Sequence, residues 1–258
     1  MNITSTLLME MLAAYIWPFT RLASMLMTML VIGSQSVPIM VRMFYTMALT
    51  AVIAPVLPKM PSTELFSMAG VLITSQQVLI GIAIGLVSQM LMQAFIMAGQ
   101  VISMQTSLGF ASMVDPLNGE STPVIGQFYL MLGTLLFFAL DGHLTMIQMI
   151  SQSFITLPVG AEGLTIGSMR SIVDFVSVLF QTALSFSLSA TIALLLINFA
   201  FGVMTRAAPQ LNIFSMGFAV TMICGLFIMW ASLSGFMDHF VLHWQRTQNL
   251  MCDVLALS

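Results

Sequence analysis

The chain has 258 residues, of which 59% are hydrophobic and only 6% are charged, and its formal net charge is −3. Soluble domains carry roughly 25% charged residues, so this composition excludes a soluble protein. It indicates an integral membrane protein or the buried subunit of a membrane complex. Six scattered basic residues form no patch that could neutralise phosphates, which excludes nucleic acid as a partner.

In chain order, the hydrophobicity pattern predicts an all-α, polytopic membrane-type fold with broken helices and helical hairpins. We expect a single domain over residues 1–258. The expected apolar segments are 7–32, 37–57, 65–98, 125–157, 172–203 and 213–236, with a central loop at 99–123 and a mixed tail at 237–258. Segment 65–98 exceeds the roughly 20 residues that a bilayer span needs. Within it, Gly81 and Gly85 form a small-xxx-small pattern, which predicts close approach of another helix.

Two polar stripes at helical spacing interrupt the apolar segments. The first contains Gln89, Gln93, Gln100 and Ser103, and the second contains Asp174, Ser177, Gln181 and Ser185. Lipid does not tolerate such faces. The first stripe predicts either bonds to neighbouring helices or an aqueous path.

The central loop is far less hydrophobic than the segments on either side of it. Gly109, Pro116, Gly119 and Pro123 break any helix there. Irregular backbone beside a bilayer must be buried in protein or line a cavity, because lipid offers it no hydrogen-bond partners. A solvated loop would not need the apolar run formed by Leu108, Gly109, Phe110, Ala111, Ser112, Met113 and Val114. We interpret the loop as re-entrant, with an apolar tip where a passage closes; the alternative is an ordinary interhelical loop.

Two further interruptions predict hairpins or interrupted helices. Asp141, Gly142 and His143 divide segment 125–157. Farther along, Pro209 and Asn212 follow Arg206, which is expected to cap helix carbonyls or bond a carboxylate at the turn.

No residue pattern predicts an enzyme, a cofactor or a metal site. His239 and His243 share a helical face, but a zinc protease would need glutamate where Phe240 stands. Asp141 beside His143 lacks a nucleophile motif, and no P-loop is present.

A different function class uses the rare intramembrane charges. Arg21, Arg42, Asp174 and Arg206 could serve a secondary transporter of ions or small solutes, built on discontinuous helices. Inverted-repeat symmetry would favour that alternative, and none is detectable.

Several motifs, taken together, are similar to one known family. They are Ala98 to Gln105, Leu108 to Ala111, Val114-Asp115-Pro116, Asp141 to Leu144, Leu157 to Gly160, Arg206 to Phe214, and Trp17-Pro18 with Arg21. Taken in chain order, they resemble the FliR family of flagellar type III export-gate subunits, related to the SctT-type subunits of injectisomes. Gln100 departs from a glutamate that is frequent in that family, and Met113 replaces an aromatic residue of some relatives.

The resemblance implies a non-enzymatic subunit of the export gate in the bacterial inner membrane, within the flagellar basal body. It implies FliP-like and FliQ-like partners in a helical ring, an FlhB-type partner, and unfolded flagellar proteins as substrates. Residues 108–114 would then belong to a plug in the closed pore. Phe110 and Met113, three residues apart, would face the same way on a helical turn.

Overall fold

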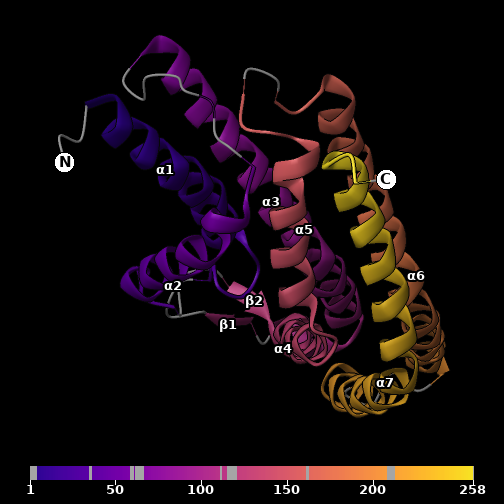
Figure 1. Ribbon diagram of the computed structural model, residues 1–258. Coiled ribbons are helices and arrows are strands. Elements are labelled where there is room, and N and C mark those ends of the chain that lie inside the picture. Colours follow the sequence, from indigo (N-terminus) through magenta and orange to yellow (C-terminus); the bar gives the residue numbers. More distant parts are fainter. Residues whose placement is uncertain are drawn as a thin grey trace. The chain divides into compact units, whose positions relative to one another are not determined.

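The computed structural model describes residues 5–34, 37–58, 61, 67–110, 112–114, 121–160, 163–207 and 213–257. Within these ranges the α-helices are α1 (Ser5–Thr28), α2 (Ile39–Ile53), α3 (Met68–Gln105), α4 (Val124–Ala139), α5 (Gly142–Thr156), α6 (Ile166–Ala207) and α7 (Ile213–Val254). Two 3-10 turns, Ala54–Val56 and Ser107–Phe110, and two short strands, β1 (Ser112–Val114) and β2 (Ser121–Pro123), complete the described elements (Figure 1). The predicted all-α class is confirmed.

The described elements form two compact units. Unit 1 comprises Met1–Met90, Asp141–Val176 and Arg246–Ser258, and unit 2 comprises Leu91–Leu140 and Ser177–Gln245. The helices α3, α6 and α7 each contribute to both. That the chain works as one domain stays a prediction.

Unit 1 is built around the packing of α1 against α2, α3 and α5. Its apolar cluster contains Ala13, Trp17, Ile73, Phe154 and Val159. A Cβ atom added at Gly81 would overlap Ser24 Oγ and the Arg21 carbonyl, and one added at Gly85 would overlap the Thr28 hydroxyl. The close helix approach predicted from these two glycines is therefore confirmed, between α3 and α1.

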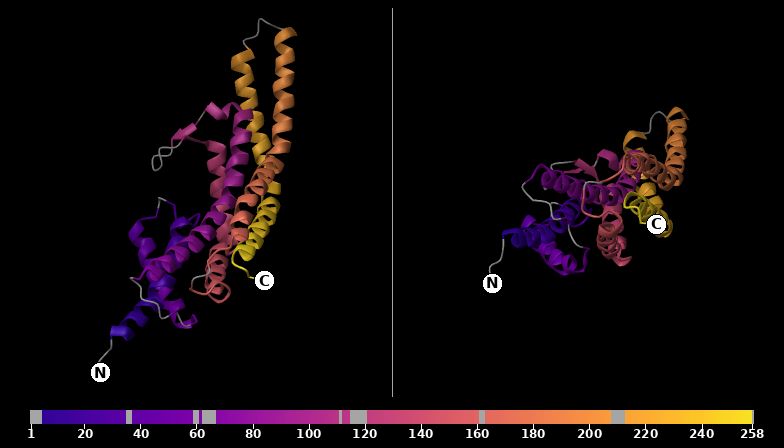
Figure 2. Two further views of the ribbon diagram at one scale, coloured as in Figure 1. Left: turned by 90° about the horizontal axis from the view of Figure 1, so that it is seen from above. Right: turned by 45° about the horizontal axis from the view of Figure 1, so that its top comes forward.

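Unit 2 contains an aromatic core contributed by α3, α4, α6 and α7. Phe95, Tyr129, Phe186, Phe236 and Phe240 have ring centroids 5.0–6.2 Å apart. Such ring pairs add about 0.5–1.5 kcal/mol each beyond area burial. Within this unit α6 and α7 lie side by side as an antiparallel hairpin, which Figure 2 shows in orange and yellow.

Two helices extend beyond their predicted ends. The helix expected to end at residue 98 continues as α3 to Gln105, because Gly99 is used for close packing rather than for a turn. The tail expected from residue 237 belongs to α7, which ends at Val254. Phe240, Trp244 and Met251 are buried at helical spacing, and this apolar stripe favours continued helix over the scattered polar residues.

The predicted break after segment 125–140 is present. Asp141 adopts a left-handed conformation with φ of 52°, and the Leu140 N–H bonds back to Leu136 while the Thr145 N–H bonds to the Asp141 carbonyl. One helix therefore ends and another begins within three residues. Asp141 is exposed, whereas Gly142 is buried and His143 is half-buried.

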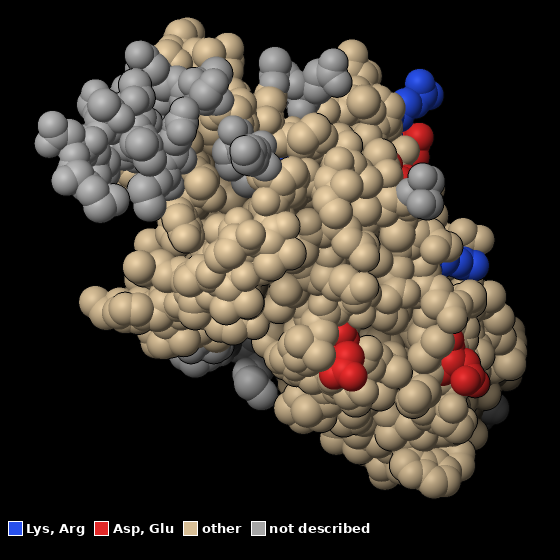
Figure 3. Space-filling view, viewed as in Figure 1, with Lys and Arg blue, Asp and Glu red and all other residues tan. Residues whose placement is uncertain are grey.

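Four of the described helical stretches are long and apolar enough to cross a membrane, or up to five if α4 and α5 form one broken span. Large apolar side chains remain exposed on α2, α6 and α7; on α2 the buried residues are Thr46 and Thr50 instead. Charged side chains on the face in Figure 3 are few and scattered. These helices therefore present apolar surface suited to lipid or to protein neighbours.

Candidate functional site

The central loop leaves α3 through a 3-10 turn and then forms a two-stranded antiparallel ribbon. Ser112 pairs with Pro123, Met113 with Thr122, and Val114 with Ser121. Phe110 ends the 3-10 turn and Met113 lies in β1, so the helical-turn interpretation of these two residues is wrong. Strand pairing satisfies backbone groups that a single exposed turn would leave open. Ala111 and the ribbon's tip, residues 115–120, lie outside the described residues.

The base of this loop is held from two other helices. The last helical hydrogen bond of α3 runs from the Thr106 N–H to the Ile102 carbonyl. The Gln105 carbonyl therefore accepts no hydrogen bond from within the helix. Asn198 of α6 donates to it from Nδ2 at 3.3 Å. From α7, Gly225 packs so closely on Thr106 that an added Cβ would overlap the Thr106 Cγ2 methyl. Thr106 is fully buried as a result.

The two helices that carry the loop also contact each other through glycine. A Cβ atom added at Gly99 of α3 would lie 2.7 Å from the Gly126 Cα atom of α4. Leu108 is half-buried and Gly109 is exposed where the chain leaves this contact. The loop thus departs from a closely packed base.

We expect Gly99→Ala to destabilise the protein by about 1–3 kcal/mol, because the added methyl overpacks a backbone contact. Thermal unfolding of the protein in native membrane vesicles would measure this. Gly235→Ala is the matched control: Gly235 lies in α7 with nothing within 4 Å of an added Cβ. Helix propensity alone should make that variant neutral or up to about 1 kcal/mol more stable. Equal losses in both variants would contradict the close-packing argument.

Arg21 of α1 is the centre of a second polar site, in unit 1. Its side chain is fully buried, and Nε donates to Gln77 Oε1 at 2.8 Å while Nη1 donates to Ser153 Oγ at 2.9 Å. Nη2 donates to the Leu157 carbonyl at 2.9 Å, and the guanidinium carbon lies 4.1 Å from the centre of the Phe154 ring. One cation therefore links α1, α3 and the end of α5.

The partners of Arg21 are neutral. Among the residues that the structure describes, Arg21 forms no ion pair. A guanidinium is weakly hydrated and presents donors in a rigid fork, and its face is attracted to an aromatic ring. These properties allow an unpaired cation to stay buried. Sequence reasoning singled out Arg21 but missed Gln77 and Ser153, since nothing in their local patterns marks them.

The residues of the first polar stripe differ in their hydrogen bonds and in their exposure. Gln89 donates from Nε2 to the Thr28 carbonyl at 2.9 Å, so the expected bond to a neighbouring helix is confirmed for this residue. Gln93 and Gln100 are exposed on α3, whereas Ser103 is fully buried. The exposed part of the stripe is therefore Gln89, Gln93 and Gln100.

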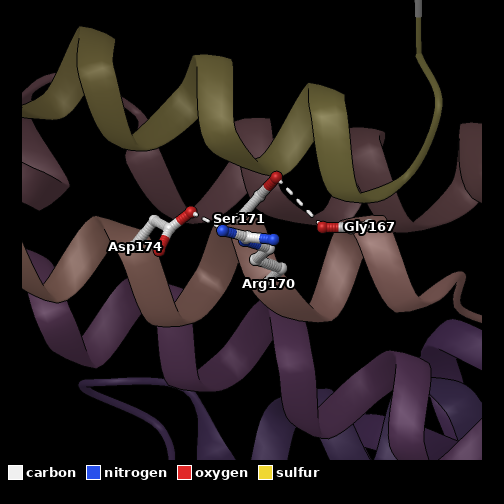
Figure 4. Close-up of polar contacts among 4 residues, drawn as sticks. All are labelled: Gly167, Arg170, Ser171 and Asp174. Atoms are coloured by element: carbon white, nitrogen blue, oxygen red, sulfur yellow. Dashed lines mark hydrogen bonds and ion pairs between the residues drawn. The ribbon is translucent and has the colours of Figure 1, made fainter.

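The second stripe lies entirely on the exposed side of α6, and its members are Asp174, Ser177, Gln181 and Ser185. Arg170 pairs with Asp174 at 3.7 Å, with 83% and 70% of the two side chains exposed, and Ser171 bonds the Gly167 carbonyl beside it (Figure 4). An ion pair this exposed contributes about 0–1 kcal/mol. The stripe is thus a solvated or partner-facing surface rather than a structural core.

The remaining predicted residues have separate environments. Arg206 is exposed in the last turn of α6, where a cation interacts favourably with the helix dipole, and Pro209 and Asn212 lie outside the described residues. Arg42 donates to the Ser34 and Val37 carbonyls between α1 and α2. Arg21, Arg42 and Asp174 therefore each bind different partners and do not converge on one ion site.

The two C-terminal histidines are packed into unit 2. His243 is buried, with Nδ1 3.3 Å from Thr182 Oγ1, and the His239 ring packs edge-on against Phe186. Across the described ranges no group of three or more His, Cys, Asp or Glu residues could hold a metal ion. Both histidines serve helix packing.

Apolar spans and a broken helix pair define a multi-pass membrane protein. A family model described as "Bacterial export proteins, family 1" matches residues 12–247. The flagellar biosynthetic protein FliR of Escherichia coli (strain K12) is 34% identical over 257 residues, which cover 99% of this chain and 98% of that protein. FliR of Pectobacterium carotovorum subsp. carotovorum is 33% identical (94% and 92% covered), and FliR of Caulobacter vibrioides is 31% identical (91% and 93%).

The chain belongs to this export-protein family, the family of the FliR proteins. The resemblance drawn from the sequence motifs is therefore confirmed. Together with the candidate spans, the family assigns the chain to the bacterial inner membrane as a multi-pass protein.

Proposed function

We propose that this protein is a core subunit of the flagellar type III export gate. It forms part of the channel through which unfolded flagellar proteins cross the inner membrane, and its central loop plugs the closed pore. The chain would act as a channel component and not as an enzyme.

The observation that carries the proposal is the closely packed base from which the central loop leaves. Gln105 and Thr106 are held by Asn198 and Gly225, and Gly99 packs on Gly126. A plug needs such a fixed mount, because a seal must return to one position after each substrate passes. The run of residues 108–114 supplies apolar and small side chains, which can exclude water without a rigid fit.

The exposed polar stripes support a hetero-oligomeric assembly. Gln93 and Gln100 are exposed on α3, a helix otherwise apolar enough to span a membrane. An amide facing hydrocarbon is costly, whereas an amide facing another subunit can be hydrogen-bonded. We propose that Gln89, Gln93 and Gln100, together with Arg206, Pro209, Asn212 and the Asp141–Gly142–His143 break, contribute to assembly with FliP-like and FliQ-like subunits and an FlhB-type subunit.

Expressed alone in detergent, the chain is expected to aggregate or be degraded, because its exposed apolar and polar surfaces lack partners. Co-expression with FliP-like and FliQ-like subunits should yield a mixed complex on size-exclusion chromatography. The double variant Gln93→Leu, Gln100→Leu should lower the yield of that complex severalfold. Gln245→Leu, the same exchange at an exposed position of α7, is the control. A monodisperse, heat-stable monomer would contradict the proposal.

A further inference from the structure

The end of α3 is contacted from both helices of the α6–α7 hairpin. Asn198 of α6 binds the Gln105 carbonyl, and Gly225 of α7 packs on Thr106, the next residue. We propose that the hairpin positions the central loop through these two contacts, so that a displacement of the hairpin moves the loop. This inference rests on the proposed function, since the position of the loop matters for transport only if the loop closes a passage.

The Asn198 contact restrains the direction in which the central loop leaves the end of α3. Carbonyls at a helix C-terminus lack partners within the helix, and a side-chain donor fixes how the last turn is oriented. Asn198 is half-buried and supplies that donor to Gln105. The 3-10 turn Ser107–Phe110 begins only two residues later. A small rotation of the last turn of α3 is therefore carried into the loop.

The Gly225 contact restrains the same end of α3, but from α7 instead of α6. An added Cβ there would overlap Thr106 Cγ2 and lie 2.9 Å from Thr106 Cβ. Because Thr106 is β-branched and fully buried, few rotamers are open to its methyl group, and a closer approach of α7 would push on its backbone. α7 cannot approach α3 at this point without displacing the start of the loop.

The α6–α7 hairpin has exposed apolar surface near Asn198 and Gly225. Six large apolar residues near Asn198 and Gly225 in the sequence are exposed; they are Leu195, Leu196, Phe199, Ile223, Leu226 and Phe227. An exposed apolar surface of this kind fits a membrane or a protein neighbour. Whatever covers it also borders the two contacts that hold the loop.

The test uses loop accessibility as a readout independent of pore closure. The half-buried Leu108 is changed by Leu108→Cys in a Cys224→Ala, Cys252→Ala background. A water-soluble maleimide then labels this position in the co-expressed complex. Asn198→Asp removes the donor and sets a carboxylate against the Gln105 carbonyl, and it should change the labelling rate by about fivefold or more. Asn198→Gln keeps an amide donor and should stay within about twofold of the parent.

Three further variants separate positioning from general damage. Ser187 lies three helical turns before Asn198 on α6, and its hydroxyl donates to the Leu184 carbonyl of its own helix at 3.3 Å. Ser187→Ala should leave the labelling rate unchanged. Gly225→Ala should change the rate like Asn198→Asp does, and adding Thr106→Ser should return it part of the way by removing the clashing methyl.

The outcomes separate this inference from the proposed function. Altered labelling in Asn198→Asp and Gly225→Ala, with Ser187→Ala unchanged, supports positioning by the hairpin, even if membrane permeability stays normal and the plug is wrong. Parent-like labelling in both variants, in complexes of normal yield, would overturn the inference. In that case, a leak caused by replacing residues 108–114 would still leave the plug standing.

Discussion

Replacing residues 108–114 with small polar residues is expected to make the membrane leaky to ions or small solutes in cells that express the complete gate. The run contains Leu108, Phe110, Met113 and Val114, whose apolar side chains would no longer exclude water from the closed passage. Permeability should rise by about tenfold or more, which corresponds to a shift of about 1.4 kcal/mol in the equilibrium between closed and open forms. Conductance or solute-uptake measurements would determine this.

Assembly provides the control for that experiment. Because Gln105 and Thr106 are held by α6 and α7 and lie before the replaced run, the complex should still co-purify in normal yield. Phe110→Ala alone should have a smaller effect, since methionine side chains can fill the gap. Unchanged permeability with normal assembly would mean that the stretch is an ordinary loop.

Arg21→Met is expected to be the most destabilising single substitution among the described charged residues. Methionine keeps much of the apolar stem but leaves Gln77 Oε1, Ser153 Oγ and the Leu157 carbonyl without their donor. Each stranded buried polar group costs about 1–3 kcal/mol, so the total loss should reach about 3 kcal/mol or more. The yield and thermal unfolding temperature of the complex would measure it.

Arg21→Lys and Arg170→Met complete this series. Lysine keeps the charge but cannot match three acceptors with a planar fork, so it should fall between wild type and Arg21→Met. Arg170 has 83% of its side chain exposed, and its removal should change stability by no more than about 1 kcal/mol. If Arg21→Met were as stable as Arg170→Met, the Arg21 network would have no structural importance.

Local sequence features predicted the elements better than their ends. The Asp141–Gly142–His143 interruption correctly predicted a helix break, because glycine and short polar residues act on backbone conformation within a few positions. Gly99 was misinterpreted as the start of the loop. A glycine that permits a close helix contact and one that permits a turn are identical in sequence, and only the presence of Gly126 distinguishes them.

The sequence by itself determined the membrane class, the helical segments and the family, because hydrophobic content, helical periodicity and motif order are properties of neighbouring residues. Only the tertiary structure decided which polar groups meet. Arg21 and Ser153 are 132 residues apart, and Asn198 and Gln105 are 93 residues apart. Periodicity orients the faces of one helix, but many apolar faces could pack together with similar energy. The choice among them depends on side-chain fit summed over the whole fold, which no local pattern contains.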